Sequence, residues 1–88
     1  MIEVYGKPNC PQCEEVKTML EMSNTPYEYY TLDVDFTRDE LFEQFPTART
    51  FPQVKCEGKV IGGISEFKEY YEKEYYEQTH SGSTEGKL

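Results

Sequence analysis

No part of this 88-residue sequence is apolar over the roughly 18 residues that a membrane-spanning helix needs. The sequence also lacks the basic stretch followed by an apolar segment that marks a secretory signal. We therefore expect a soluble, cytoplasmic protein with no membrane partner. The length corresponds to one small domain, which we expect to be monomeric.

Positive charge is scarce in this sequence. Nine Lys and Arg residues stand against 17 Asp and Glu residues, so the formal net charge is −8. Binding to nucleic acid or to an anionic membrane surface needs clustered Lys and Arg side chains. We therefore expect neither as a partner, and an anionic ligand would have to find a local positive site.

Cysteine is also limited to three residues, an odd number and too few for the disulfide framework of a small secreted protein. Two of them form the pair Cys10-Pro11-Gln12-Cys13. In a reducing compartment, such a close pair is more often catalytic or metal-binding than structural. This pair is therefore the main candidate for chemistry.

Short hydrophobic segments alternate between the spacing of strands and the spacing of helices. Strands are predicted at residues 2–6, 27–34, 51–56 and 60–63, with a glycine-containing hairpin turn between the last two. Helices are predicted at residues 11–22, 37–45 and 65 to about 78. The order β-α-β-α-β-β-α predicts an α/β fold with a mixed four-stranded sheet and three helices.

Helix-capping signals support two of these boundaries. Thr37 and Glu40 have the spacing of a capping box, and Ser65 is expected to cap the last helix. The apolar residues expected on the buried side of the second helix are Leu41, Phe42 and Phe45. Residues 78–88 are polar and rich in Gly and Ser, so we expect a disordered tail after a domain of residues 1–77.

The cysteine pair falls at the start of the first predicted helix. If Pro11 is the first helical residue, Cys10 is the N-cap, where backbone N–H groups and the helix dipole stabilise a thiolate. The pKa of Cys10 should then lie below the ordinary value of about 8.5. Cys13 shares a helical face with Val16 and Leu20, so we expect it to point inward and Cys10 to face solvent. An exposed nucleophile beside a sheltered resolving thiol suits thiol–disulfide exchange.

Three other interpretations of the pair remain open. Both cysteines could simply pack in the core. Structural zinc needs four ligands, and only Cys56 and His80 remain to complete such a set, so we expect no metal. An iron–sulfur cluster held between two copies of the chain is harder to exclude from the sequence.

Pro52 enters a predicted strand, where proline removes one hydrogen bond of the ladder. It therefore lies either at a sheet edge or in a cis turn that presents backbone groups to a ligand. The residues alone do not decide between these two arrangements.

Three motifs, taken in order, resemble those of the dithiol glutaredoxins over residues 2–76. They are Lys7-Pro8-Asn9-Cys10-Pro11-Gln12-Cys13, then Thr50-Phe51-Pro52, then Gly62-Gly63 followed by Ser65-Glu66. The resemblance implies a thioredoxin-like fold and the reduction of protein disulfides and of mixed disulfides with glutathione. Glutathione would be the reductant, and disulfide-containing proteins, with ribonucleotide reductase as one candidate by family analogy, would be the partners.

The resemblance also implies roles for individual residues. Cys10 would be the nucleophile, Cys13 the resolving thiol, and the Phe51-Pro52 bond would be cis, with the Phe51 backbone pairing with the cysteinyl part of glutathione. The glycine carboxylate would be held by Lys7, Gln44 and Arg49. The γ-glutamyl carboxylate would bind Ser65 and the first amides of the last helix. The full glutathione-binding set is Lys7, Gln44, Arg49, Thr50, Phe51, Pro52, Gly63, Ser65 and Glu66.

The sequence departs from the family pattern at three positions, one of which is Ile64, where a cysteine is common in the family. Gln12 stands where many members carry Tyr, and Phe51 stands where most carry Val. A Cys-x-Gln-Cys core also resembles redoxins that serve ribonucleotide reductase and are re-reduced by thioredoxin reductase, in which the glutathione contacts are typically missing. The presence of Lys7, Gln44 and Ser65 favours glutathione, and a thioredoxin-reductase-linked redoxin and a cluster-binding module are the alternatives.

Overall fold

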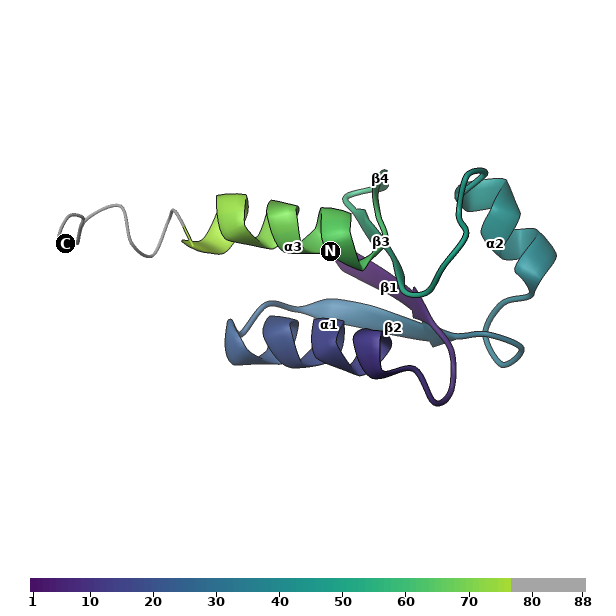
Figure 1. The fold of residues 1–88 in the computed structure, drawn as a ribbon, viewed down its shortest axis with the longest axis horizontal. Coiled ribbons are helices and arrows are strands. Elements are labelled where there is room, and N and C mark those ends of the chain that lie inside the picture. The colour runs from purple at the N-terminus through teal and green to yellow at the C-terminus, as the bar shows by residue number, and fades with distance from the viewer. Residues whose placement is uncertain (77–88) are drawn as a thin grey trace, which may run out of the picture.

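The computed structural model describes residues 1–76 and contains the predicted order of elements (Figure 1). Its strands are β1 (Ile2–Gly6), β2 (Tyr27–Thr31), β3 (Gln53–Cys56) and β4 (Lys59–Gly62). Its α-helices are α1 (Pro11–Met22), α2 (Arg38–Gln44) and α3 (Ile64–Tyr71), and a π-helical turn, Glu72–Tyr76, follows α3. The predicted end of the last helix near Gln78, the domain boundary at residue 77 and the tail 78–88 lie outside the described residues.

The four strands form one mixed sheet in the order β2-β1-β3-β4. β1 and β2 are parallel, whereas β3 runs antiparallel to both β1 and β4. Glu57 and Gly58 turn the hairpin with positive φ angles of 54° and 81°, which suits a two-residue hairpin loop. The predicted α/β fold is confirmed, and its central strand β1 leads directly to the cysteine pair.

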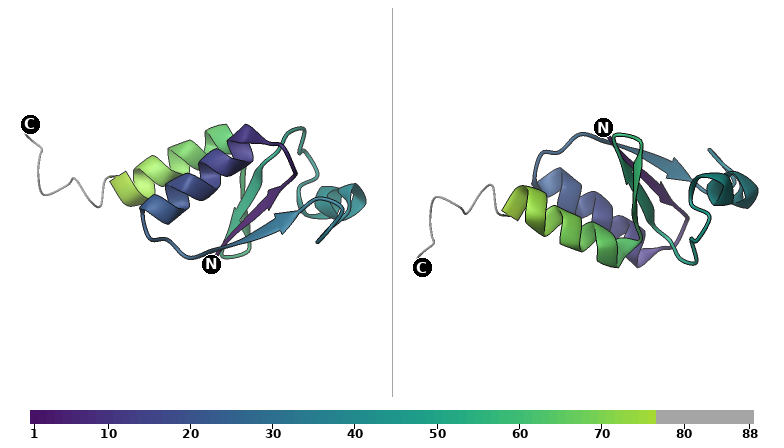
Figure 2. Two further views of the ribbon diagram at one scale, coloured as in Figure 1. Left: turned by 90° about the horizontal axis from the view of Figure 1, so that it is seen from below. Right: turned by 90° about the horizontal axis from the view of Figure 1, so that it is seen from above.

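The sheet buries a different hydrophobic cluster on each face, because successive side chains of a strand point in opposite directions. α1 and α3 lie side by side over one face (Figure 2). They enclose the first cluster, which consists of Ile2, Val4, Val16, Leu20, Val54 and Phe67. The second cluster consists of Tyr5, Leu32, Phe36, Leu41 and Phe45. It includes Tyr5 of β1 and Leu41 of α2, and α2 lies beyond the end of the sheet where β1 and β2 finish (Figure 1).

The capping box predicted for α2 is confirmed. The Glu40 backbone N–H donates to Thr37 Oγ1 at 3.2 Å, and the Thr37 backbone N–H donates to Glu40 Oε1 at 2.8 Å. Two donors that the helix itself leaves unpaired are therefore satisfied. Leu41 and Phe45 are buried as expected, but the prediction was wrong for Phe42, which is 44% exposed.

Other boundaries also differ from the prediction. β3 begins at Gln53, where its pairing with Tyr5 of β1 begins, rather than at residue 51, and β4 covers Lys59–Gly62 rather than residues 60–63. β2 ends at Thr31 rather than Val34, because its partner β1 ends at Gly6 and Asp33 adopts a left-handed φ of 66°. The last helix is capped by Gly63 rather than by Ser65. Glu66 Oε1 accepts a hydrogen bond from the Gly63 backbone N–H at 3.0 Å, which places the cap three residues before Glu66.

Candidate active site

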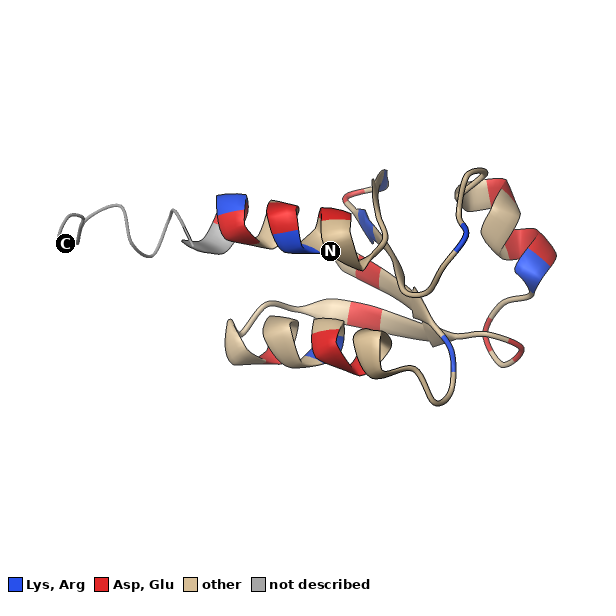
Figure 3. Cartoon of the chain, in the orientation of Figure 1, with Lys and Arg blue, Asp and Glu red and all other residues tan. Residues whose placement is uncertain are grey.

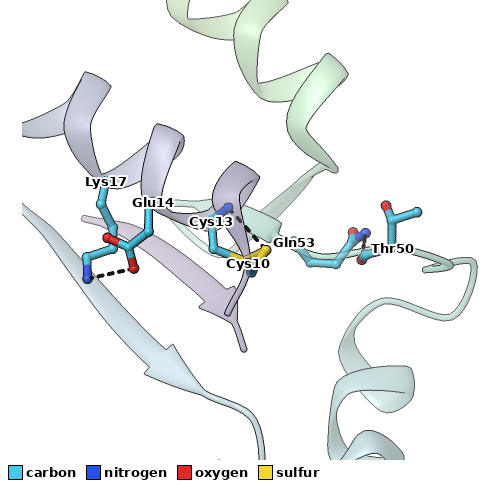
Figure 4. The surroundings of a disulfide bond; sticks show 6 residues. All are labelled: Cys10, Cys13, Glu14, Lys17, Thr50 and Gln53. Atoms are coloured by element: carbon cyan, nitrogen blue, oxygen red, sulfur yellow. Dashed lines mark hydrogen bonds and ion pairs between the residues drawn. A yellow bond between two sulfur atoms is a disulfide. The ribbon is translucent and has the colours of Figure 1, made fainter. Parts of the chain in front are cut away.

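Cys10 and Cys13 lie where β1 ends and α1 begins, and they are joined by a disulfide. Asn9 turns the chain before them with a φ of 56°, a left-handed conformation that Asn adopts more readily than most residues. Pro11 opens the helix, as predicted, and Cys10 is its N-cap. The Cys13 backbone N–H points at Cys10 Sγ from 3.2 Å (Figure 4). The sulfur of Cys10 therefore already faces a donor that would stabilise a thiolate.

The two sulfurs differ in burial, although less than expected. Cys13 is fully buried beside Val16 and Leu20, whereas Cys10 keeps 6% of its surface exposed. The prediction that Cys10 faces solvent was therefore wrong for the disulfide form, in which the Cys10 side chain is buried. Its remaining surface opens into a pocket of about 360 Å³.

Among residues 1–76, three cations and no carboxylate line this pocket. They are Lys7 from the loop after β1, Arg38 at the first position of α2, and Arg49 from the loop before β3. Figure 3 shows blue segments at these three places near the same end of the sheet. In a chain of net charge −8, this cluster is a local positive site next to the reactive sulfur.

Phe51 forms an aromatic wall of the same pocket. Lys7 Nζ lies 5.6 Å from the centre of its ring and Arg38 Cζ lies 6.0 Å from it, both within the range of cation–π attraction. The Phe51–Pro52 peptide bond is cis, as the motif implied. Pro52 is buried, and the exposed Thr50 lines the pocket. The carbonyl of Thr50 accepts a hydrogen bond of 2.8 Å from Gln53 Nε2, which holds this loop against β3 (Figure 4).

A second pocket, of about 450 Å³, shares Arg49 and Thr50 with the first and extends toward the start of α3. Gly63 and Glu66 line it. A Cβ added at Gly63 would lie 3.4 Å from Thr50 Oγ1, so the backbone here passes close to the loop before β3. Ser65 is exposed in the first turn of α3 and does not line either of these two pockets.

Gln44 is not brought to either pocket, although the resemblance implied a ligand contact. Its Oε1 accepts hydrogen bonds from the Tyr5 hydroxyl at 3.2 Å and from Lys55 Nζ at 2.8 Å. Burial raises the pKa of Tyr5, so this hydroxyl is a donor at neutral pH. These contacts dock α2 onto β1 and β3.

Arg38 is the residue that the sequence reasoning missed. The order of elements could have indicated it, because Arg38 is the first residue of the helix that follows β2, and β2 runs parallel to β1. Carboxyl ends of parallel strands meet at one edge of a sheet, so a residue just beyond β2 can approach the cysteine loop.

The third cysteine lies apart from the pair. Cys56 is half-buried in β3, and its Sγ lies 3.1 Å from the Tyr70 hydroxyl. Among residues 1–76, no group of three or more His, Cys, Asp or Glu side chains could hold a metal ion. His80, the other residue considered for zinc, lies outside this part of the chain. None of the described helices is long and apolar enough to cross a membrane.

Comparison with known proteins places this site in a family. The family model named Glutaredoxin matches residues 2–61. A glutaredoxin of Ricinus communis is 32% identical over 65 residues, which cover 70% of this chain and 64% of that protein, so less than two thirds of its length is matched.

Solved structures have the same fold. Reduced Escherichia coli glutaredoxin matches with a TM-score of 0.72 at 21% identity, over 83% of this chain and 94% of that one. A buckwheat glutaredoxin–glutathione complex matches with a TM-score of 0.71 at 28% identity, over 82% of this chain and 68% of that one. Since the family match includes the cysteine pair and the cis-proline loop, this chain belongs to the glutaredoxin family, with Cys10 and Cys13 as its redox pair.

Proposed function

We propose that the protein is a glutathione-dependent thiol–disulfide oxidoreductase that reduces glutathione mixed disulfides and protein disulfides. One observation carries this proposal. The Cys10 sulfur, held at the start of α1, opens into a pocket that is lined by Lys7, Arg38 and Arg49 and by no carboxylate of the part of the chain that the structure describes. The buckwheat glutaredoxin bound to glutathione supports the choice of reductant.

The start of α1 activates Cys10 for nucleophilic attack. A helix N-terminus contributes about 0.3–1 kcal/mol to a nearby anion, and up to about 2 kcal/mol in a partly buried geometry. A hydrogen bond to a charged group adds about 1.5–3 kcal/mol, although part of this overlaps with the dipole contribution. The Cys13 backbone N–H is placed to make that bond. These donors therefore favour the thiolate of Cys10, the form that attacks a disulfide, once the Cys10–Cys13 bond is reduced.

The reaction on a glutathione mixed disulfide proceeds by two exchanges. The Cys10 thiolate attacks the glutathione sulfur, and the substrate thiolate leaves and takes a proton from solvent. A glutathione thiolate then attacks that same glutathione sulfur, which releases glutathione disulfide and the Cys10 thiolate. With a protein disulfide, the Cys10 thiolate attacks one substrate sulfur, the other substrate sulfur leaves as a thiolate, and a mixed disulfide forms. The Cys13 thiolate then attacks Cys10 Sγ, which breaks the mixed disulfide, releases the second substrate thiolate and forms the Cys10–Cys13 disulfide. Two glutathione molecules reduce that disulfide and leave as glutathione disulfide.

The cations beside Cys10 account for glutathione binding. Glutathione carries two carboxylates and one ammonium group, so a cationic pocket in an acidic protein favours it over neutral thiols. We assign the glycine carboxylate to Lys7, Arg38 and Arg49, with Arg38 in the place first given to Gln44. The Phe51 backbone would pair with the cysteinyl part in the manner of an added strand. The γ-glutamyl end would lie in the second pocket, near Thr50, Gly63 and Glu66, with the amide of Ser65 at the start of α3 as a further donor.

The test is a glutathione-coupled assay with a glutathione mixed disulfide, glutathione reductase and NADPH. Wild type and Cys13→Ser should turn over, whereas Cys10→Ser should be inactive. Cys56→Ser is the matched control and should keep full activity, because Cys56 lies in β3 away from the pocket.

Three outcomes would contradict the proposal. Lack of turnover by the wild type would refute it directly. Turnover with thioredoxin reductase but not with glutathione would assign the chain to the redoxins. Stoichiometric iron and acid-labile sulfide in the purified protein, with no glutathione turnover, would assign it to cluster binding.

A further inference from the structure

A tyrosine hydroxyl lies beneath the buried cysteine, on a strand that the family motifs do not include. Tyr29 belongs to β2 and pairs with Val4 of β1. A Cβ added at Gly6 would overlap the Tyr29 hydroxyl oxygen and would lie 3.1 Å from Cys13 Sγ. The hydroxyl and the sulfur therefore border the same small space over Gly6. Glycine at this position leaves that space open for the two polar atoms.

The surroundings of Tyr29 keep its hydroxyl protonated. Burial raises the pKa of Tyr29, and the nearby carboxylate of Glu14 raises it further. Lys17 Nζ lies 4.5 Å from the centre of the ring and also pairs with Glu14 at 3.6 Å. Figure 4 shows the side chains of Glu14 and Lys17 extending from α1 toward β2. Tyr29 is therefore a hydrogen-bond donor at neutral pH.

This donor has no hydrogen-bond acceptor among residues 1–76 in the disulfide form. Cys13 Sγ, which is bonded to Cys10 Sγ in that form, is a weak acceptor. When the disulfide opens, Cys13 gains a negative charge in a fully buried position. A buried anion without a donor is costly, and the Tyr29 hydroxyl is a side-chain donor adjoining it.

We propose that Tyr29 is a positioning residue for Cys13, and that its hydroxyl donates a hydrogen bond to the Cys13 sulfur when the Cys10–Cys13 disulfide opens. This inference rests on the proposed function and goes beyond it, because it assigns Tyr29 only to the steps in which the Cys10–Cys13 disulfide opens or forms. The nucleophile Cys10 does not depend on this bond.

The step that this bond assists is the reduction of the protein's own disulfide. A glutathione thiolate attacks Cys10 Sγ, a new sulfur–sulfur bond forms between them, and the Cys10–Cys13 bond breaks. The electron pair of the broken bond leaves on Cys13 as a thiolate, which later takes a proton from solvent. In the reverse direction, Cys13 loses its proton and its thiolate expels glutathione from Cys10. Both directions pass through a negatively charged Cys13 sulfur.

The experiment compares Tyr29→Phe with Tyr30→Phe. Phe keeps the ring on which Lys17 lies and removes only the hydroxyl. Tyr30 is the matched control, because its side chain packs against the other cluster and its hydroxyl bonds to Glu28. The measured quantities are the rate of reduction of the Cys10–Cys13 disulfide by dithiothreitol and by glutathione, and the equilibrium of that disulfide with a glutathione buffer.

Tyr29→Phe should slow disulfide reduction by about tenfold, since one hydrogen bond to a charged sulfur is lost, and should shift the equilibrium toward the disulfide. In a Cys10→Ser background it should raise the pH at which Cys13 is alkylated. In a Cys13→Ser background it should leave glutathione-coupled turnover unchanged. Tyr30→Phe should change none of these.

Equal rates and equal alkylation profiles for wild type and Tyr29→Phe would overturn the inference. A loss of glutathione-coupled turnover on adding Tyr29→Phe to the Cys13→Ser variant would also overturn it, because that loss would mean that Tyr29 has a general structural role. Dithiothreitol opens the disulfide without a glutathione site, so a failure of the proposed function would leave this test intact.

Discussion

Replacing Arg38 and Gln44 separately with Ala should affect different properties of the protein. Arg38 lines the pocket beside Cys10, whereas Gln44 bonds Tyr5 and Lys55. Arg38→Ala should therefore weaken the use of glutathione mixed disulfides and leave stability nearly unchanged. Gln44→Ala should lower stability and leave the use of glutathione mixed disulfides nearly unchanged.

The expected sizes follow from the surroundings of each side chain. Arg38 is exposed, and exposed ion pairs contribute about 0.2–1 kcal/mol, less than buried ones. Taking about 1 kcal/mol, the loss in kcat/KM is roughly fivefold. Gln44→Ala leaves the buried Tyr5 hydroxyl without its acceptor, which costs about 1–3 kcal/mol. For a domain of this size, each kcal/mol lowers Tm by roughly 4–8 °C.

The assay is the glutathione-coupled turnover of both variants at 0.05 M and 0.5 M salt, together with their thermal unfolding. The defect of Arg38→Ala should shrink at the higher salt concentration, because screening weakens the ion pair in the wild type. A loss of kcat/KM in Gln44→Ala at unchanged Tm, with full activity in Arg38→Ala, would refute the reasoning. Gln44 would then contact the ligand after all.

Three further predictions concern stability. Gly6→Ala should lower the free energy of unfolding by about 1–3 kcal/mol in urea titrations, because the new methyl group meets the Tyr29 hydroxyl; an unchanged midpoint would show that this space is not needed. Thr37→Ala should cost about 1 kcal/mol in the same titration, because the capping box is lost, and a cost near zero would mean that the cap is redundant. Burial, and then the hydrogen bond to Glu21, raises the pKa of Tyr27 to about 12 in the folded protein. Folding therefore favours the neutral phenol, and the stabilisation from Tyr27 is complete below about pH 10 and is lost toward pH 12. Tyr27→Phe should flatten the dependence of the free energy of unfolding on pH between these values. The same pH dependence in both proteins would contradict the assignment.

Local sequence signals predicted most of the fold correctly. β1 and α1 have the predicted bounds, because Pro11 and the spacing of apolar residues mark the helix without help from tertiary contacts. The errors occur where a partner element decides the outcome. β2 ends early because its neighbour β1 ends, and the cap of α3 falls on Gly63 because the Glu66 carboxylate reaches back to it.

The candidate site shows the same division. The cysteine pair, Lys7, Arg49 and the loop with Phe51 follow each other in short motifs, and the structure gathers them at one pocket. Which residue of α2 reaches this pocket depends on how the helix is rotated about its own axis. Positions 38 and 44 are six residues apart, which places them about 120° apart around the helix and about 9 Å apart along it. Only one of them can face the pocket, and the packing of Leu41 and Phe45 on the sheet decides which.

The two halves of the site therefore depend on different faces of the sheet. Cys13 sits on α1 beside the first cluster, and the Tyr29 hydroxyl borders the same space over Gly6, so the proposed bond to the Cys13 sulfur belongs to this face. Arg38 is placed by the second cluster, against which Phe51 packs while it also lines the pocket. Phe51 connects the two halves, because its ring contacts Lys7 and Arg38 within reach of Cys10. Where most family members are expected to carry Val, a larger ring that attracts two cations fixes the positive charge at the reactive sulfur, although the chain as a whole is acidic.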